Sequence, residues 1–202
     1  MSIFKTKAIL AEVRACNVCA AHLKAGPRPI VQFGSKASIV IIGQAPGARV
    51  HESGIPWRDD SGNRLREWTG ICEADFYNPA LVALVPMGFC YPGTGSSGDL
   101  PPRPECAPLW HDRIMALLPA KRLTLLVGSY SQVRYLNAPK RQTLTQSVKT
   151  FSDYLPDFFP LPHPSWRSSA WMKNNPWFAR KVLPALRAKV AEALVRPQDG
   201  LK

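Results

Sequence analysis

The sequence predicts an α/β fold, a three-layer α/β/α sandwich around a four-stranded, mainly parallel sheet. Short apolar runs alternate along the chain with segments whose apolar residues recur at helical spacing. The run at 39–42, Ile-Val-Ile-Ile, is apolar at every position, which is typical of a strand buried on both faces of a parallel sheet. With 202 residues and 46% hydrophobic content, the chain can form a single domain with a sizeable core.

The first half of the chain contains two predicted helices and two predicted strands. Apolar residues at helical spacing cover residues 6–23, and the first strand follows at 39–42. The next helix covers 61–70, with Asp60 or Ser61 as its N-cap. The second strand covers 80–85. We expect the helix at 6–23 to be an N-terminal addition to a core that spans about 37–195.

The second half continues the alternation. A helix at 107–118 ends at Pro119, and a strand at 122–127 leads into a helix at 128–136. Residues 140–149 are basic and polar, which indicates a loop or an edge. The fourth strand covers 158–161, and an amphipathic helix covers 175–195.

The formal net charge of +12 indicates a polyanionic partner, nucleic acid before a membrane surface. No apolar run approaches the ~20 residues of a membrane-spanning helix, and the first residues lack the apolar region of a signal peptide. We therefore expect a cytoplasmic, nucleoid-associated monomer with no membrane partner. Because the cytosol is reducing, its five cysteines are expected to be metal ligands or core residues rather than disulfides.

The segment 38–60 carries the first candidate site. After the strand at 39–42 come Gly43, Gln44 and Ala45, then Pro-Gly, a turn at the strand end where open α/β sheets bind ligands. Trp57 follows in a loop, close before Asp59 and Asp60. An aromatic plane, amides and carboxylates together suit holding a flat polar ring and activating a water beside it. An ordinary turn and an acidic N-cap would have the same sequence.

Four cysteines form a candidate metal site. Cys16 and Cys19 are a C-x2-C pair, while Cys90 and Cys106 bracket a segment rich in glycine, serine and proline. Such a segment cannot form a core of its own, so a bound metal would explain its order. Four thiolates suit zinc or a [4Fe–4S] cluster. For the first pair, two buried cysteines on a helix face are the simpler alternative, and Cys72 is expected to be a core residue.

Taken in order, these motifs resemble the uracil-DNA glycosylase superfamily, with the iron–sulfur-containing families four and five as the nearest branches. Residues 43–47 resemble motif one, Gly54–Trp57 stand where those branches have Gly-Arg-Pro-Phe, and His163-Pro164-Ser165 resemble motif two. The fifteen residues between Cys90 and Cys106 match the cluster-ligand pattern of family four. The resemblance extends from Cys16 to the last helix.

The resemblance implies a DNA repair enzyme that flips uracil out of DNA and hydrolyses its N-glycosidic bond, without a lyase step. Trp57 would stack on the base, and Gln44 with the amides around Gly43 and Ala45 would bind its polar edge. His163 would stabilise the negative charge on the leaving base. The loop with Pro164, Ser165, Trp166 and Arg167 would contact the DNA, and Cys16, Cys19, Cys90 and Cys106 would hold a [4Fe–4S] cluster, or zinc instead.

Two departures from the family pattern change these expectations. Motif one lacks its acidic residue. The superfamily most commonly has an Asp at the third position of this motif, and family four has an acid one position earlier, but this chain has Ala45 and Gln44 there. Family five instead uses an Asp after its Pro-Phe, and we assign water activation to Asp60 or Asp59, with Asp60 preferred. Family four has an Asn before the third cysteine that reads the pyrimidine. This chain has Pro-Met-Gly-Phe there, which points to a broader or shifted specificity for deaminated bases.

Two other functions remain open from the sequence. One is a relative that binds uracil-containing DNA without turnover, in which His51 or His111 would form a covalent bond. The other is a zinc-stapled nucleic-acid-binding module without pocket chemistry. Six cations are candidates for phosphate contacts, which position a protein without reading sequence: Arg49, Arg58, Lys140, Arg141, Lys149 and Lys173.

Overall fold

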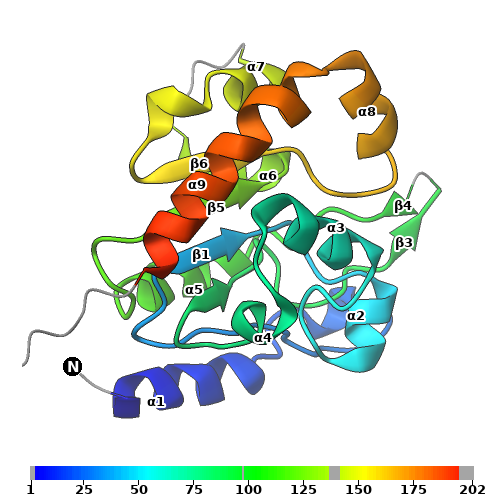
Figure 1. The fold of residues 1–202 in the computed structure, drawn as a ribbon. Helices are drawn as coiled ribbons and strands as arrows, with labels where there is room; N and C mark the ends of the chain where they lie inside the picture. The colour runs from blue at the N-terminus through cyan, green and yellow to red at the C-terminus, as the bar shows by residue number, and fades with distance from the viewer. Residues whose placement is uncertain (1–2, 97, 137–141, 196–202) are drawn as a thin grey trace, which may run out of the picture.

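The computed structural model describes residues 3–96, 98–136 and 142–195. Its centre is a sheet of four parallel strands: β1 (Ile39–Ile42), β2 (Val82–Leu84), β5 (Leu123–Val127) and β6 (Phe158–Leu161). Their spatial order is β2-β1-β5-β6, and β1 pairs with Val82 and Leu123 at its first residue, Ile39. The predicted α/β fold with a four-stranded parallel sheet is confirmed (Figure 1).

Helices cover both faces of the sheet because each strand is apolar on both sides. Ile39 and Ile41 join a core cluster with Trp68 and Phe178, whereas Val40 and Ile42 join a second cluster. The first cluster is closed by α3 (Asp60–Thr69), α4 (Glu73–Phe76), α7 (Leu144–Lys149) and α9 (Leu183–Leu194). The second is closed by α1 (Ile3–Arg14), α5 (Cys106–Met115) and α6 (Ser129–Tyr135). These two layers make the sandwich, and α9 runs across the front of the sheet in Figure 1.

Short elements complete the described chain. They are the helices α2 (Ala48–Ser53) and α8 (Ser168–Asn174), the 3-10 turns η1 (Ala20–His22) and η2 (Phe151–Tyr154), and the π-helical turn η3 (Phe178–Val182) that leads into α9. A two-stranded antiparallel hairpin, β3 (Thr94–Gly95) and β4 (Gly98–Asp99), stands apart from the main sheet. It lies at the same end of the molecule as α2, α3 and α8 (Figure 1).

Three predicted elements differ from the structure. The N-terminal helix ends at Arg14 rather than continuing to residue 23, so Cys16 and Cys19 lie in the turns that follow it. Residues 144–149 form α7 rather than a loop, because Thr143 and Gln146 make a capping box at its start. Cys72 is exposed at the start of α4 and is not a core residue.

Within the part of the chain that the structure describes, no helix combines the length and the apolar character needed to span a membrane.

Candidate active site

A cavity of about 450 Å³ opens at the carboxyl ends of β1, β2 and β6. Its volume lies within the range of small-molecule sites, and its position is where open parallel sheets bind ligands. The turn after β1 supplies Gly43, Gln44 and Ala45, and the segment after β6 supplies His163 and Ser165. Ile30, Val50 and Pro86 contribute apolar walls. The structure thus brings the two predicted motifs, about 120 positions apart in sequence, to one cavity.

Trp57 forms one wall of this cavity. Its ring stacks on that of His163 with centroids 5.8 Å apart and an interplanar angle of 27°. The indole also lies against Gly43, where an added Cβ would come within 2.5 Å of Trp57 Cζ2. Gly62 is needed for a similar reason, since a Cβ there would lie 1.7 Å from the Trp57 carbonyl oxygen. Two glycines therefore leave the room that the aromatic side chain and its loop occupy.

The two candidate aspartates are in different environments. Asp59 lines the cavity, and its Oδ1 accepts a hydrogen bond of 2.8 Å from the Gly62 backbone N–H, so that Asp59 is the N-cap of α3. Asp60 does not line it. Its side chain is 84% exposed and forms an ion pair of 3.0 Å with Arg49. The geometry therefore favours Asp59 over Asp60 as the residue that activates water. The N-cap of α3 is Asp59, whereas the sequence predicted Asp60 or Ser61.

His163 is partly buried and lines the cavity. Burial lowers the pKa of its imidazole below the usual value, and the carboxylates of Asp59 and Asp99 offset part of this shift. At neutral pH the ring is therefore uncharged, and it can donate one hydrogen bond without bringing a formal charge.

Arg64 holds the loop that carries His163, a role that the sequence analysis missed. From α3, its guanidinium donates hydrogen bonds to the backbone carbonyls of Pro164 and Ser165 and to the hydroxyl of Ser168. Arg64 and these partners are about a hundred residues apart, so no local pattern could have indicated the contact. Pro164 is buried and does not line the cavity, which makes it a structural residue of the loop.

The rest of this loop faces outward. Trp166 is 76% exposed, and the Arg167 guanidinium lies over its ring at 5.2 Å from the centroid. Both residues line the mouth of the cavity. An exposed indole at the rim of a cavity is suited to stacking against a nucleic-acid base.

Asp99 lines the cavity, and the sequence analysis did not identify it as a site residue. It lies at the end of the β3–β4 hairpin, and its Oδ1 accepts a hydrogen bond of 3.4 Å from the Thr94 hydroxyl. Its Oδ2 lies 3.3 Å from the point that a Cβ on Gly47 would occupy, and Asp59 Oδ2 lies 4.0 Å from the same point. Two carboxylates therefore approach Gly47 from different parts of the chain.

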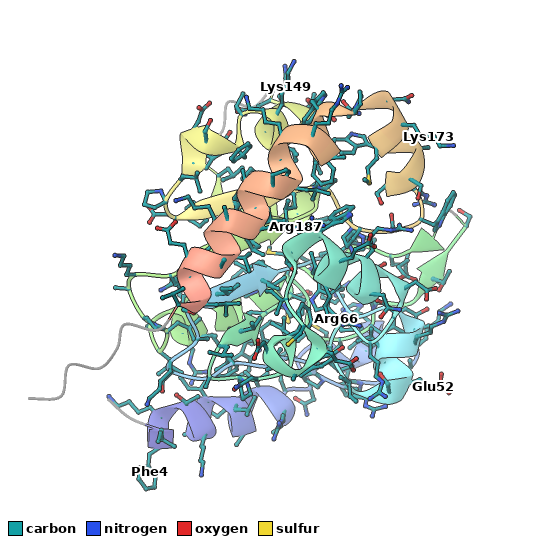
Figure 2. All side chains as sticks on the ribbon, in the orientation of Figure 1. Phe4, Glu52, Arg66, Lys149, Lys173 and Arg187 are labelled. Carbon is teal, nitrogen blue, oxygen red and sulfur yellow. The ribbon has the colours of Figure 1, made fainter. Side chains whose placement is uncertain are left out.

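The candidate phosphate contacts are spread over the surface. Lys149 and Lys173 point outward in Figure 2, and Arg49 and Arg58 are exposed but do not line the cavity. Lys140 and Arg141 lie outside the described residues. Neither His51 nor His111 lines the cavity. His111 is fully buried in α5 and bonded to the Pro86 carbonyl and the Tyr135 hydroxyl.

Cys16, Cys19, Cys90 and Cys106 line one small internal cavity together with Arg103 and Trp110. Burial raises the pKa of Cys19, Cys90 and Cys106, the last to about 12, so these thiols are protonated when no cation accompanies them. The backbone N–H of Phe89 donates a hydrogen bond of 3.3 Å to Cys106 Sγ. Among the described residues, however, no three histidine, cysteine, aspartate or glutamate side chains are close enough to hold one metal ion.

Comparison with known families gives one match that covers most of the chain. The family description is the uracil DNA glycosylase superfamily, and the matched residues are 31–187. The match contains the whole parallel sheet, the Trp57 loop and the His163 loop, and it begins after Cys16 and Cys19. The parallel sheet, the cavity at its carboxyl edge and this match show that the chain belongs to the uracil DNA glycosylase superfamily.

Proposed function

We propose that this protein is a monofunctional DNA glycosylase that excises uracil, or another deaminated base, from DNA. The observation that carries the proposal is the meeting of Trp57, Gln44, Asp59 and His163 around one cavity in a chain of this superfamily. The net charge of +12 favours binding to a polyanion. The enzyme would act as a monomer on DNA in the cytoplasm, where the nucleoid lies.

The base would be flipped out of the helix and held flat in the cavity. Trp57 provides an aromatic surface, which contributes about 1–3 kcal/mol per stacked base. Gln44 can both donate and accept hydrogen bonds, so it can read an edge that presents a carbonyl oxygen beside an N–H. Because its amide fits this pair in uracil as well as in hypoxanthine or xanthine, the exact base preference depends on the fit beside Trp57.

Bond cleavage needs charge stabilisation at both ends of the bond. As the C1′–N bond breaks, its electron pair stays on the base, and the neutral His163 imidazole donates a hydrogen bond to the resulting anion. The sugar becomes cationic, and the Asp59 carboxylate stabilises it and orients a water toward C1′. A lyase step would need a primary amine to form a Schiff base, and no lysine is among the described residues that line the cavity.

We also propose that the four cysteines around the second cavity hold a [4Fe–4S] cluster. Soft thiolate ligands select zinc or iron–sulfur clusters. The four sulfurs line one cavity whose other residues are mostly apolar, and four cysteine thiolates are the usual ligand set of such a cluster. When bound, the cluster would connect the turns after α1, which carry Cys16 and Cys19, to the segment from Cys90 to Cys106.

The two other functions receive less support. A covalent bond to DNA through histidine would require His51 or His111 at the cavity, and neither lines it. A zinc-stapled binding module without chemistry would not explain the cavity with its neutral histidine and its capped aspartate.

Single-turnover excision on labelled oligonucleotides tests the proposal. Each oligonucleotide carries one uracil, hypoxanthine or xanthine, in single- or double-stranded form, and abasic sites are cleaved with alkali. We expect excision of at least one of these bases, and its loss in Asp59→Asn but not in Glu52→Gln, an exposed acid on α2 that points away from the molecule (Figure 2). Absence of excision from every substrate would overturn the proposal.

A further inference from the structure

The β3–β4 hairpin places a second acid at the cavity. We propose that Asp99 acts with Asp59 as a pair of carboxylates that flank the sugar C1′ and the attacking water. This inference rests on the proposed function for the reaction itself, but the charge of the pair can be measured without turnover.

The geometry of the two side chains is the first argument. Each aspartate uses Oδ1 for local structure, Asp59 to cap α3 and Asp99 to accept from Thr94. Each turns Oδ2 toward Gly47, to within 3.3 Å for Asp99 and 4.0 Å for Asp59 of the position of an added Cβ. Two carboxylate oxygens from distant parts of the chain therefore border the same small space beside motif one.

Gly47 is the second argument. Its φ of −81° is accessible to any residue, so backbone conformation does not require glycine at this position. What a side chain would change is the space next to Asp99 Oδ2, since a Cβ at 3.3 Å is a tight contact. Without a Cβ at this position, the space beside the two Oδ2 atoms stays open to the cavity that both aspartates line.

The chemistry of hydrolysis is the third argument. When the C1′–N bond breaks with its electron pair on the base, positive charge develops on the sugar. The water oxygen then bonds to C1′, and one water proton passes to a carboxylate. Two carboxylates can orient both protons of the water and face the cation from two sides, as in glycoside hydrolysis, where paired acids serve one bond. Motif one lacks its usual acid here, and Asp99 provides the second negative charge from the hairpin.

The test compares two DNA duplexes that carry an uncleavable abasic analogue. One contains a pyrrolidine ring, which is cationic at neutral pH, and the other contains the uncharged tetrahydrofuran ring. The ratio of their dissociation constants isolates the preference for positive charge. Any general gain in DNA affinity from removing a negative charge affects both duplexes and cancels. Asn keeps an oxygen that can accept from Thr94, so Asp99→Asn preserves the hairpin contact.

We expect the wild-type protein to prefer the cationic duplex, Asp99→Asn to lose about tenfold of that preference, and Glu52→Gln to keep it. Gly47→Ala should lower single-turnover excision although both carboxylates remain. An unchanged preference in Asp99→Asn, or no preference in the wild-type protein, would overturn the inference. Failure of the proposed function looks different: the wild-type protein would prefer the cationic duplex but excise none of the three bases.

Discussion

The backbone conformation of Trp57 predicts that replacing it with glycine gives a more stable protein than replacing it with alanine, although glycine removes more of the side chain. Among the described residues, Trp57 is the only non-glycine with a positive φ, 58°. This left-handed conformation costs an L-residue with a Cβ about 1–2 kcal/mol. Glycine adopts it without that cost, but its flexible unfolded chain lowers stability by about 0.4–1 kcal/mol relative to alanine.

We therefore compare Trp57→Gly with Trp57→Ala. Both lose the indole and its stack on His163, so those contributions cancel in the comparison. The strain term exceeds the entropy term, and Trp57→Gly should have a free energy of unfolding about 1 kcal/mol above that of Trp57→Ala. At a loop position with negative φ the order would be the opposite. Urea denaturation of both variants at the same pH measures the difference.

The same two variants also separate stability from base binding. Each lacks the aromatic surface, so each should weaken binding of DNA with the target base by about 1–3 kcal/mol. Equal losses in affinity with unequal stability would show that the ring contributes the affinity and that the backbone strain affects stability alone. If Trp57→Ala is as stable as Trp57→Gly, the argument from strain is wrong. If affinity is unchanged, stacking by Trp57 is wrong.

Three further predictions concern the elements around the cavity. Arg64→Met should lower the rate of single-turnover excision by about tenfold, because the charged hydrogen bonds to the His163 loop are lost. The control Arg66→Met, which loses hydrogen bonds to Asn63 and Tyr77, should leave excision unchanged. Burial lowers the pKa of His111 to about 4, so on acidification the unfolded chain binds a proton at this residue before the folded protein does. The free energy of unfolding should therefore fall by about 1.4 kcal/mol per pH unit from pH 6.5 to 4. Denaturation midpoints of His111→Asn across that range should lack this component, and an equal slope would contradict it. Purified protein should be brown with about four irons per chain, and Cys106→Ala should lose iron and colour while Cys72→Ala keeps both; a colourless protein with one zinc would refute the cluster.

The strands of the sheet could be predicted because each is a short continuous run of residues that is apolar at nearly every position. The run at 39–42 is the β1 strand of the structure, and the predicted strand at 122–127 differs from β5 by one residue. The N-terminal helix was predicted too long because Val13 and Cys16 both pack inward. A turn that follows a helix can continue the apolar spacing without continuing the helical hydrogen bonds.

The choice between Asp59 and Asp60 depends on one hydrogen bond that the sequence does not reveal. Both residues precede a helix, and either could cap it. Once Asp59 accepts from the Gly62 N–H, Asp60 enters the first turn of α3 and its side chain points to solvent and Arg49. A shift of one residue at the helix start therefore moves a carboxylate from the cavity to the surface.

Asp99 and Arg64 could not be found from sequence for a different reason. Asp99 lies in a segment rich in glycine, serine and proline, where no periodicity predicts a hairpin. Arg64 lies in α3 at a position that the helical pattern would assign to the surface. Its partners Pro164 and Ser165 are about a hundred residues away in the sequence. Asp99 lines the cavity and Arg64 holds the loop beside it, both through tertiary contacts that local sequence patterns do not record.

The hairpin also links the two cavities through continuous chain. The segment leaves Cys90, forms β3 and β4 with Asp99 at its end, and returns through Arg103 to Cys106. Both ends of this segment are therefore cysteines of the small cavity, and Glu105 near its second end pairs with Arg103 and accepts from the Cys19 thiol. None of the four strands of the main sheet lies in this segment, so no sheet hydrogen bonds of the core hold it. If the cysteines hold the proposed cluster, the cluster would help to fix the position of Asp99, and it would affect the proposed hydrolysis through structure, without a redox step.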